Sequence, residues 1–251
     1  MNLSPAAVPS TEMAVTEDRL LGGRVRLLQP QRGYRVAVDA VLLAASVGAG
    51  PAERVLDLGA GAGAVGLCLA ARLPGCEVVG LELQKEMTEL ARRNAQLNGC
   101  GDRVRTIVHD LAAGLPPGMG QFDWVVTNPP YLAAEVADPP PDRAKALATV
   151  ESSAKLEHFL GAAAGAAKPA GTVALVHRSD RLDEILSGLR ALGWNELVVK
   201  RLPPAARVLV RARRATQASL REAVPLQLHG PDGCFTQEAD AVLRRAAALV
   251  F

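Results

Sequence analysis

The feature that most restricts the fold of this chain is a regular alternation of strand and helix that begins near residue 53. The predicted strands cover residues 54–58, 77–81, 104–108, 122–126, 172–176, 196–200 and 207–210. The predicted helices cover residues 64–73, 85–97, 143–167 and 182–192. Strands separated by helices pair in parallel, so we expect one doubly wound α/β sheet. No helix separates the last two strands, which predicts an antiparallel C-terminal strand in a mostly parallel sheet.

The flanks of this alternation have a different character. Residues 1–18 are rich in Ser, Pro, Ala and Thr, which predicts a flexible tail. A short strand that ends at Pro30 and an apolar helix at 40–47, with Asp39 as its N-cap, form an expected N-terminal extension over 19–50. We therefore predict a single domain over 19–251, in which a core at 51–214 is followed by a C-terminal segment at 215–251.

Composition excludes several classes of protein. Of the 251 residues, 49% are hydrophobic, which is too apolar for a disordered chain. The first residues lack the pattern of a signal peptide, and no segment offers the roughly 18 apolar residues of a membrane span. The four cysteines show no C-x-x-C spacing, so we expect no disulfide framework, no metal site and a cytoplasmic location. The net charge of +2 indicates no particular partner.

A glycine-rich turn, Asp57-Leu-Gly-Ala-Gly-Ala-Gly63, follows the first predicted strand of the core, and Glu82 follows the second. Three interpretations are open. The turn could be purely structural, and Gly61, Gly63 and Gly66 with Glu82 also match the fingerprint of nicotinamide dinucleotide binding. S-adenosylmethionine binding is the third. Asp57 favours it, because a carboxylate there would repel a pyrophosphate and attract the ammonium group of a methionine moiety.

A second motif, Asn128-Pro-Pro-Tyr131, directly follows the strand predicted at 122–126. Ligands of open α/β sheets bind beyond the carboxyl ends of the strands, so this motif is expected beside the glycine turn. The Pro129 carbonyl and the Asn128 amide oxygen are two acceptors suited to one –NH2 group, and Pro130 makes the turn rigid. Tyr131 offers a ring on which a planar group can stack. The alternative is a turn that merely ends the strand.

Taken together, the two motifs make residues 53–214 resemble the class I amino-methyltransferases, which implies a Rossmann-like methyltransferase sheet and S-adenosylmethionine as cofactor. The resemblance implies that the Asn128–Tyr131 segment is catalytic and receives the target amine. It implies cofactor contacts at Tyr34, Asp39, Asp57, Gly59, Gly61, Gly63, Glu82, Leu83, Asp110, Leu111 and Asn128. Within this set Asp57 and the glycines would take the methionine portion, Glu82 the ribose and Asp110 the adenine amine. Helix capping is an equal alternative for Asp110.

The flanking segments bear on which amine is methylated. Residues 29–35, 39–45 and 226–238 resemble the bacterial tRNA(Val) adenine-N6 methyltransferase family, over a span of about 18–250. This resemblance implies N6-methylation of an adenosine in the tRNA anticodon loop by direct in-line transfer. Residues 139–141 and 147–151 depart from the family pattern. The alternatives are a protein glutamine-N5 methyltransferase and an NAD-dependent oxidoreductase.

Two stretches without acidic residues, 21–38 and 200–214, suggest contacts with a polyanion such as tRNA. The candidate substrate-binding residues are Arg24, Arg26, Arg32, Arg35, Lys200 and Arg201. Solvated strand faces are the alternative, and Arg207 and Arg211 could be structural. No membrane and no metal are expected as partners, and the sequence leaves the oligomeric state open.

Overall fold

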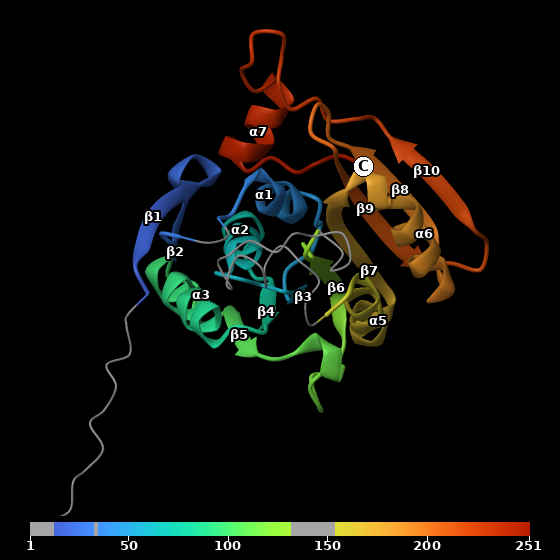
Figure 1. Ribbon diagram of the computed structural model, residues 1–251, viewed down its shortest axis with the longest axis horizontal. Helices are drawn as coiled ribbons and strands as arrows, with labels where there is room; N and C mark the ends of the chain where they lie inside the picture. Colours follow the sequence, from blue (N-terminus) through green and yellow to red (C-terminus); the bar gives the residue numbers. More distant parts are fainter. Residues whose placement is uncertain (1–12, 33–34, 132–153) are drawn as a thin grey trace, which may run out of the picture.

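The computed structural model describes residues 13–32, 35–131 and 154–251. Its central feature is an eight-stranded sheet with the order β10-β8-β9-β7-β6-β3-β4-β5 (Figure 1). The strands are β3 (Arg54–Leu58), β4 (Glu77–Glu82), β5 (Val104–Val108), β6 (Phe122–Thr127), β7 (Ala167–Arg178), β8 (Trp194–Arg201), β9 (Arg207–Arg214) and β10 (Ser219–Ala223). Only β9 runs against its neighbours β7 and β8, while every other pair in this sheet is parallel. The structure thus confirms the mostly parallel sheet with an antiparallel strand near its C-terminal end.

Helices cover both faces of the sheet (Figure 1). On one face lie α1 (Val38–Ala45), α2 (Ala64–Arg72), α3 (Lys85–Leu97) and α7 (Gln237–Arg245). On the other face lie α5 (Leu156–Ala166) and α6 (Leu182–Ala191). Each layer buries its own apolar cluster against the sheet, and burial of this apolar surface is what stabilises the layers. Short 3-10 helices lie at Leu21–Gly23 (η1), Leu111–Ala113 (η2) and Ser179–Arg181 (η3).

The strand order creates the place where a ligand can bind. From β3 the chain proceeds outward through β4 to β5, and then returns to place β6 on the other side of β3. The connections therefore leave β3 and β6 in opposite directions at their carboxyl ends. Such a switch point opens a crevice in doubly wound sheets, and both sequence motifs lie at its rim.

The N-terminal prediction needs a correction. Residues 1–12 lie outside the described residues, but Val15–Leu20 forms strand β1, which pairs antiparallel with β2 (Val25–Pro30). The flexible tail predicted to residue 18 is therefore wrong from Val15 onward. Val15 and Leu20 pack against the apolar cluster beneath α1 and α7, and this burial fixes a strand of otherwise polar composition. Gly22 and Gly23 make the turn with φ of 64° and 93°.

Two further expectations were incomplete. The helix predicted at 143–167 is present as α5, while its expected first half, up to residue 153, falls outside the described residues. Strand β10 and helix α7 were not predicted; β10 is mostly exposed and polar, so it lacks the apolar run that predicts a strand such as β3. The division at residues 50 and 214 stays a prediction. Within the described residues, no helix combines the length and apolarity needed to cross a bilayer.

Candidate active site

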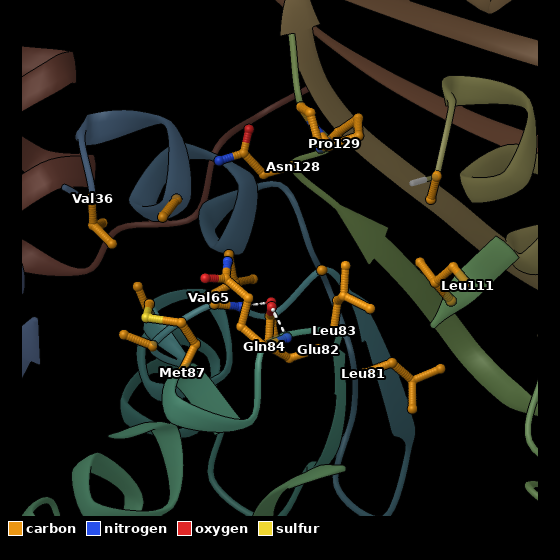
Figure 2. Close-up of a pocket in the computed structure, with 18 of the residues that line it drawn as sticks. Val36, Val65, Leu81, Glu82, Leu83, Gln84, Met87, Leu111, Asn128 and Pro129 are labelled. Atoms are coloured by element: carbon orange, nitrogen blue, oxygen red, sulfur yellow. Dashed lines mark hydrogen bonds between the residues drawn. The ribbon is translucent and has the colours of Figure 1, made fainter. Parts of the chain in front are cut away.

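A cavity of about 150 Å³ lies at the switch point of the sheet (Figure 2). Its walls come from the glycine turn after β3, the ends of β4 and β5, the segment after β6, and the region between β2 and α1. Figure 2 shows Asn128 and Pro129 on the opposite side of this cavity from Glu82 and Gln84. The structure therefore brings the two sequence motifs together around one space.

The glycine turn has a backbone that other residues rarely adopt. Gly59, Gly61 and Gly63 have φ of 76°, 54° and 85°. A Cβ on Gly59 would meet the Phe159 ring at 3.2 Å, and one on Gly63 would meet Ala91 Cβ at 3.2 Å. No atom lies within 4 Å of the corresponding position at Gly61, so the backbone there is open to close approach by a ligand.

Two buried carboxyl groups lie beside this turn. Asp57 is 2% exposed, and its Oδ2 has no hydrogen-bond partner among the described residues. Burial, together with the nearby Glu82 charge, raises the pKa of Asp57 to about 7. Burial also raises the pKa of Glu82. A cation held between these groups would relieve both effects, whereas an anion would worsen them.

Glu82 links the end of β4 to the glycine turn. Its Oε2 accepts a hydrogen bond from the Gly61 N–H and its Oε1 accepts one from the Gln84 N–H, both at 2.8 Å. The carboxylate, which offers about four lone-pair sites, keeps acceptor capacity for a ligand hydroxyl beside these backbone donors. The carboxylate lines the cavity, as an acid that takes both hydroxyls of a ribose would.

The end of β5 supplies another part of the wall. Asp110 and Leu111 line the cavity, as does Leu83 at the end of β4. Asp110 Oδ1 also accepts a hydrogen bond from the Ala112 N–H at 2.9 Å, which caps η2. Both interpretations of Asp110 therefore fit its position: it caps a helical turn and it faces the cavity.

The acceptor motif continues into a network of polar contacts. The Tyr131 hydroxyl lies 2.5 Å from Asn128 Oδ1 and 2.9 Å from Asp39 Oδ2. Arg207 Nε donates to the same Asp39 oxygen at 3.3 Å, and its guanidinium lies 4.5 Å from the centre of the Tyr131 ring. Asp39 is therefore not the N-cap of α1, a position that Ala37 occupies, because its carboxylate turns toward Tyr131 and Arg207.

His177 supports the same ring from β7. Its imidazole meets Tyr131 edge-on, with 5.1 Å between ring centres, and is completely buried. Burial, with a further contribution from the Arg181 charge, lowers the pKa of His177 to about 4. The imidazole is therefore neutral near pH 7 and acts as a packing partner of the motif rather than as a charge.

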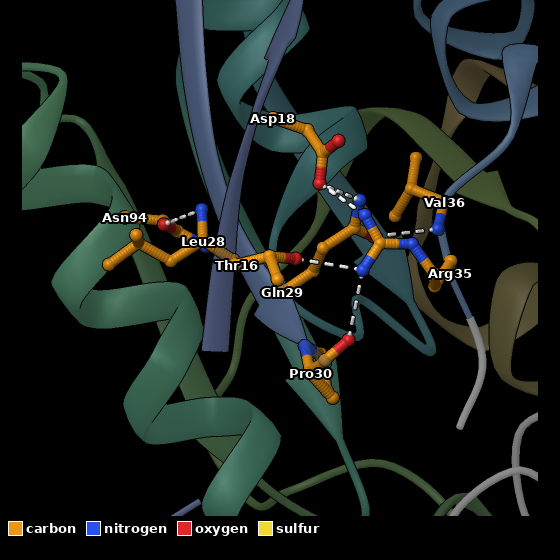
Figure 3. Close-up of polar contacts among 8 residues, drawn as sticks. All are labelled: Thr16, Asp18, Leu28, Gln29, Pro30, Arg35, Val36 and Asn94. Carbon is orange, nitrogen blue, oxygen red and sulfur yellow. Dashed lines mark hydrogen bonds and ion pairs between the residues drawn. The ribbon is translucent and has the colours of Figure 1, made fainter. Parts of the chain in front are cut away.

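The predicted basic residues fall into two groups. Arg32 lines the cavity, whereas Arg26 makes two hydrogen bonds to Glu17. Arg35 pairs with Asp18, as Figure 3 shows. The acids come from β1, which lies beside these arginines although the stretch 21–38 itself contains none. Arg24 donates to the backbone oxygens of Leu21 and Arg244.

The second basic stretch is also tied to the protein. Lys200 is 3% exposed and donates to the Val224 carbonyl, and Arg201 pairs with Glu222 on β10. Arg211 donates to the Ser46 carbonyl and stacks on Phe251. Most basic side chains of both stretches are therefore already held by groups of the protein, which argues against a free phosphate-binding stripe. Arg32, which lines the cavity, is the best remaining candidate for a phosphate contact. Tyr34 lies outside the described residues.

Several residues of the cavity were not identified from the sequence. Gln29, Val36, Met87, His109 and Phe159 line it, and Arg207 and His177 lie behind it. Gln29 has the clearest role: its Nε2 donates to Asp18 and its Oε1 accepts from the Val36 N–H, which fixes the chain at the cavity rim (Figure 3). Met87 could have been suspected, because it lies in the first turn of α3, the helix that follows Glu82. In the parts of the chain that the structure describes, no cluster of metal-ligating side chains is found.

The fold and the cavity define a doubly wound protein of the methyltransferase class, and solved structures agree. A predicted O-methyltransferase from Agrobacterium tumefaciens superimposes with a TM-score of 0.65 at 28% identity, covering 84% of this chain and 98% of that one. A 16S rRNA N2 G1207 methyltransferase from T. thermophilus, solved with AdoMet and guanosine, gives a TM-score of 0.60 at 22% identity, over 84% and 53% of the two chains. The second likeness shows the fold alone.

The chain belongs to the methyltransferase small domain family, which matches residues 35–181. A tRNA1(Val) (adenine(37)-N6)-methyltransferase from Porphyromonas gingivalis is 35% identical over 60% of this chain and 61% of its own length. A protein of the same name from Aeromonas hydrophila is 31% identical over 80% and 85%. A release factor glutamine methyltransferase from Deinococcus radiodurans is 36% identical over 64% and 58%. The matches to the first and third of these relatives thus span about three fifths of their length.

Proposed function

We propose that this protein is an S-adenosylmethionine-dependent N-methyltransferase that methylates N6 of an adenosine in the tRNA anticodon loop by direct in-line transfer. The observation that carries the proposal is the pairing of two walls around one cavity. Glu82 lines one wall of the cavity, and Asp57 lies buried behind the glycine turn of the same wall, so the two carboxyl groups favour a cation there. Asn128 and Pro129 stand across the cavity with the acceptors that an amine needs (Figure 2). A cationic methyl donor and an amine would meet between them.

The residues of the first wall fit S-adenosylmethionine. The unpartnered Asp57 oxygen and the open backbone at Gly61 suit the methionine end, which carries an ammonium group and a sulfonium. Glu82 would bind the ribose, and Asp110 with Leu83 and Leu111 would surround the adenine. When bound, the cofactor supplies a methyl group that is already activated by its positive sulfur. The protein therefore needs alignment and exclusion of water more than acid or base chemistry.

On the second wall, the chain's own residues would orient the amine. The Asn128 amide oxygen and the Pro129 carbonyl would accept its two protons, which aims the nitrogen lone pair across the cavity. The same acceptors stabilise the positive charge that develops on nitrogen as the bond forms. Tyr131 would give a flipped base a ring to stack on.

The choice of tRNA adenosine as substrate is supported by the relatives from Porphyromonas gingivalis and Aeromonas hydrophila, whose names state this activity. Binding of tRNA and a cytoplasmic location, where tRNA is found, are part of the same proposal. Arg32 at the cavity rim is the basic residue best placed to contact an RNA phosphate.

A glutamine side-chain amide is the second candidate substrate, because the same acceptors suit any –NH2 group. The relative from Deinococcus radiodurans carries that activity in its name. An NAD-dependent oxidoreductase is disfavoured, since the buried carboxyl groups beside the glycine turn would repel a pyrophosphate.

One experiment separates these candidates. Purified protein is incubated with methyl-labelled S-adenosylmethionine and, in parallel, unmodified tRNA or release factor. Digestion and mass spectrometry of the tRNA should reveal N6-methyladenosine, with no label in the release factor. Label found only in release factor would replace the proposed substrate by the second candidate, and label in neither would contradict the proposal.

A further inference from the structure

A chain of polar side chains lies behind the Asn128 amide. Arg207 on β9 contacts Asp39 on α1, Asp39 contacts the Tyr131 hydroxyl, and that hydroxyl contacts Asn128 Oδ1. Asp39 is 8% exposed, so little water competes for these contacts. In Figure 2 the amide oxygen of Asn128 is drawn on the side away from Glu82 and Gln84. These polar contacts therefore engage the Asn128 amide oxygen, which is the acceptor that the proposed amine would need.

The number of protons available to these polar side chains decides which of them donates each hydrogen bond. A phenol hydroxyl has one proton, yet two oxygen atoms lie within hydrogen-bond distance of Tyr131 Oη, at 2.5 and 2.9 Å. The proton can be donated fully to only one of them. Asp39 is a carboxylate held by Arg207, and an ionised acceptor forms the stronger bond. Tyr131 therefore donates to Asp39, and its oxygen becomes an acceptor toward Asn128.

This direction has a consequence for the amide. Half a turn about the last bond of the side chain exchanges the oxygen and the NH2 group of Asn128, which occupy nearly the same space. An accepting Tyr131 oxygen favours the NH2 group beside it, because two facing oxygens would repel. We infer that Asp39 and Arg207 are positioning residues, which set the direction of the Arg207–Asp39–Tyr131–Asn128 chain and so turn the Asn128 oxygen toward the target amine. This inference rests on the proposed amine methylation.

Arg207 contributes to the chain in two ways. It pairs with Asp39, which keeps a negative charge beside the Tyr131 hydroxyl. Its guanidinium also covers one face of the Tyr131 ring, while His177 packs against the ring edge. These two contacts hold the ring in place with its hydroxyl between Asp39 and Asn128. In the absence of the Asp39 acceptor, the Tyr131 hydroxyl would donate to Asn128 Oδ1. The NH2 group of Asn128 would then face the target amine, and two hydrogen-bond donors would oppose each other.

Steady-state kinetics with unmodified tRNA tests the inference through a double-mutant cycle. Asp39→Ala should lower kcat roughly tenfold to a hundredfold, as expected for the loss of one oriented polar contact. Asp39→Asn should recover much of this activity, because its amide oxygen can still accept the proton. In a Tyr131→Phe background Asp39→Ala should cost little more, since no hydroxyl remains to be oriented. Asp240→Asn removes an arginine-paired carboxylate on α7 and is the matched control. Equal losses from Asp39→Ala with and without the hydroxyl would overturn the inference.

A second measurement does not depend on catalysis. In ¹⁵N-labelled protein, the side-chain NH2 resonances of Asn128 should shift on Tyr131→Phe, because one amide proton loses its acceptor. Unchanged resonances would overturn the inference even in an active enzyme. If the wild type methylates no tRNA but the resonances shift as expected, the proposed function fails while the direction of the chain stands. The comparison needs only wild type and Tyr131→Phe, so it holds if Asp39→Ala does not fold.

Discussion

The two walls of the cavity are built in different ways. The glycine-turn wall runs from Gly59 to Gln84, with Asp57 buried behind it, and comes from one strand-helix-strand unit. Its key contacts join residues close in sequence, such as Gly61 and Glu82. The acceptor wall draws on α1, the end of β6, β7 and β9. Its contacts span 92 residues from Asp39 to Tyr131 and 168 residues from Asp39 to Arg207. One wall is a local motif, and the other exists only once the whole sheet has formed.

This difference suggests a division of labour. A local unit can bind a cofactor in the same way whatever surrounds it, whereas an assembled wall can change with each neighbouring element and so suit different amines. Substitutions in the glycine-turn wall should therefore affect cofactor binding, and substitutions in the acceptor wall should affect transfer. The predictions below test that separation.

Asn128→Ala should have the largest effect. Loss of the amide acceptor removes alignment of the amine and stabilisation of its developing charge, which should lower kcat about a hundredfold to a thousandfold. Affinity for S-adenosylhomocysteine, measured by calorimetry, should change less than about threefold, because the glycine-turn wall is intact. Near-normal methyl transfer by this variant would contradict the assignment of the acceptor wall.

Glu82→Gln should break the other wall. The amide cannot accept hydrogen bonds at both of its ends, so it would lose either the Gly61 or the Gln84 contact, together with the negative charge. Calorimetry should show S-adenosylhomocysteine binding weakened about tenfold to a hundredfold. Glu77→Gln, at the exposed start of the same strand, is the matched control and should bind normally. If Glu82→Gln changed kcat alone, the two walls would not be separate.

Asp57→Asn tests the electrostatics through pH. The pKa of Asp57 rises from 3.8 to about 7 on folding, so between these values the folded protein keeps a proton that the unfolded chain has released. Folding stability from this group therefore falls as pH rises through that window. Without ligand, Asp57→Asn should melt above the wild type at pH 8, by on the order of 5 °C, and this gap should close toward pH 4. A difference in melting temperature that stayed constant from pH 4 to pH 8 would show that folding does not raise the pKa of Asp57.

The sequence predicted the local wall well for a physical reason. Asp57, the three glycines and Glu82 must stand at fixed distances along the chain to build the turn, so their pattern is visible without the fold. The same holds for strands β3, β4, β6 and β9, in which runs of buried apolar residues mark the strand without the fold. Whether these residues bind the cofactor as expected stays a prediction.

The acceptor wall could be predicted only at Asn128–Tyr131. The capping rule assigned Asp39 to the start of α1, because a local preference was the only information available there. The contact with Arg207 that redirects Asp39 depends on β9 entering the sheet antiparallel beside β7. The acids of β1 and β10 that pair with Arg26, Arg35 and Arg201 are likewise not visible in the basic stretches themselves, because strand pairing brings them beside these arginines.

Arg32 and Arg26 give the smallest and most selective test. Arg32 lines the cavity, and within residues 13–32, 35–131 and 154–251 no acidic partner holds it, whereas Arg26 is already bound to Glu17. Arg32→Gln should raise the KM for tRNA about threefold and reduce the salt dependence of binding by about one ion. Arg26→Gln should leave both quantities nearly unchanged and alter the melting temperature little, because ion pairs exposed to solvent contribute little to stability. An equal effect of both variants on tRNA binding would show that the two arginines act as one diffuse positive surface. In that case the ion pair with Glu17 would not prevent Arg26 from contributing to this surface.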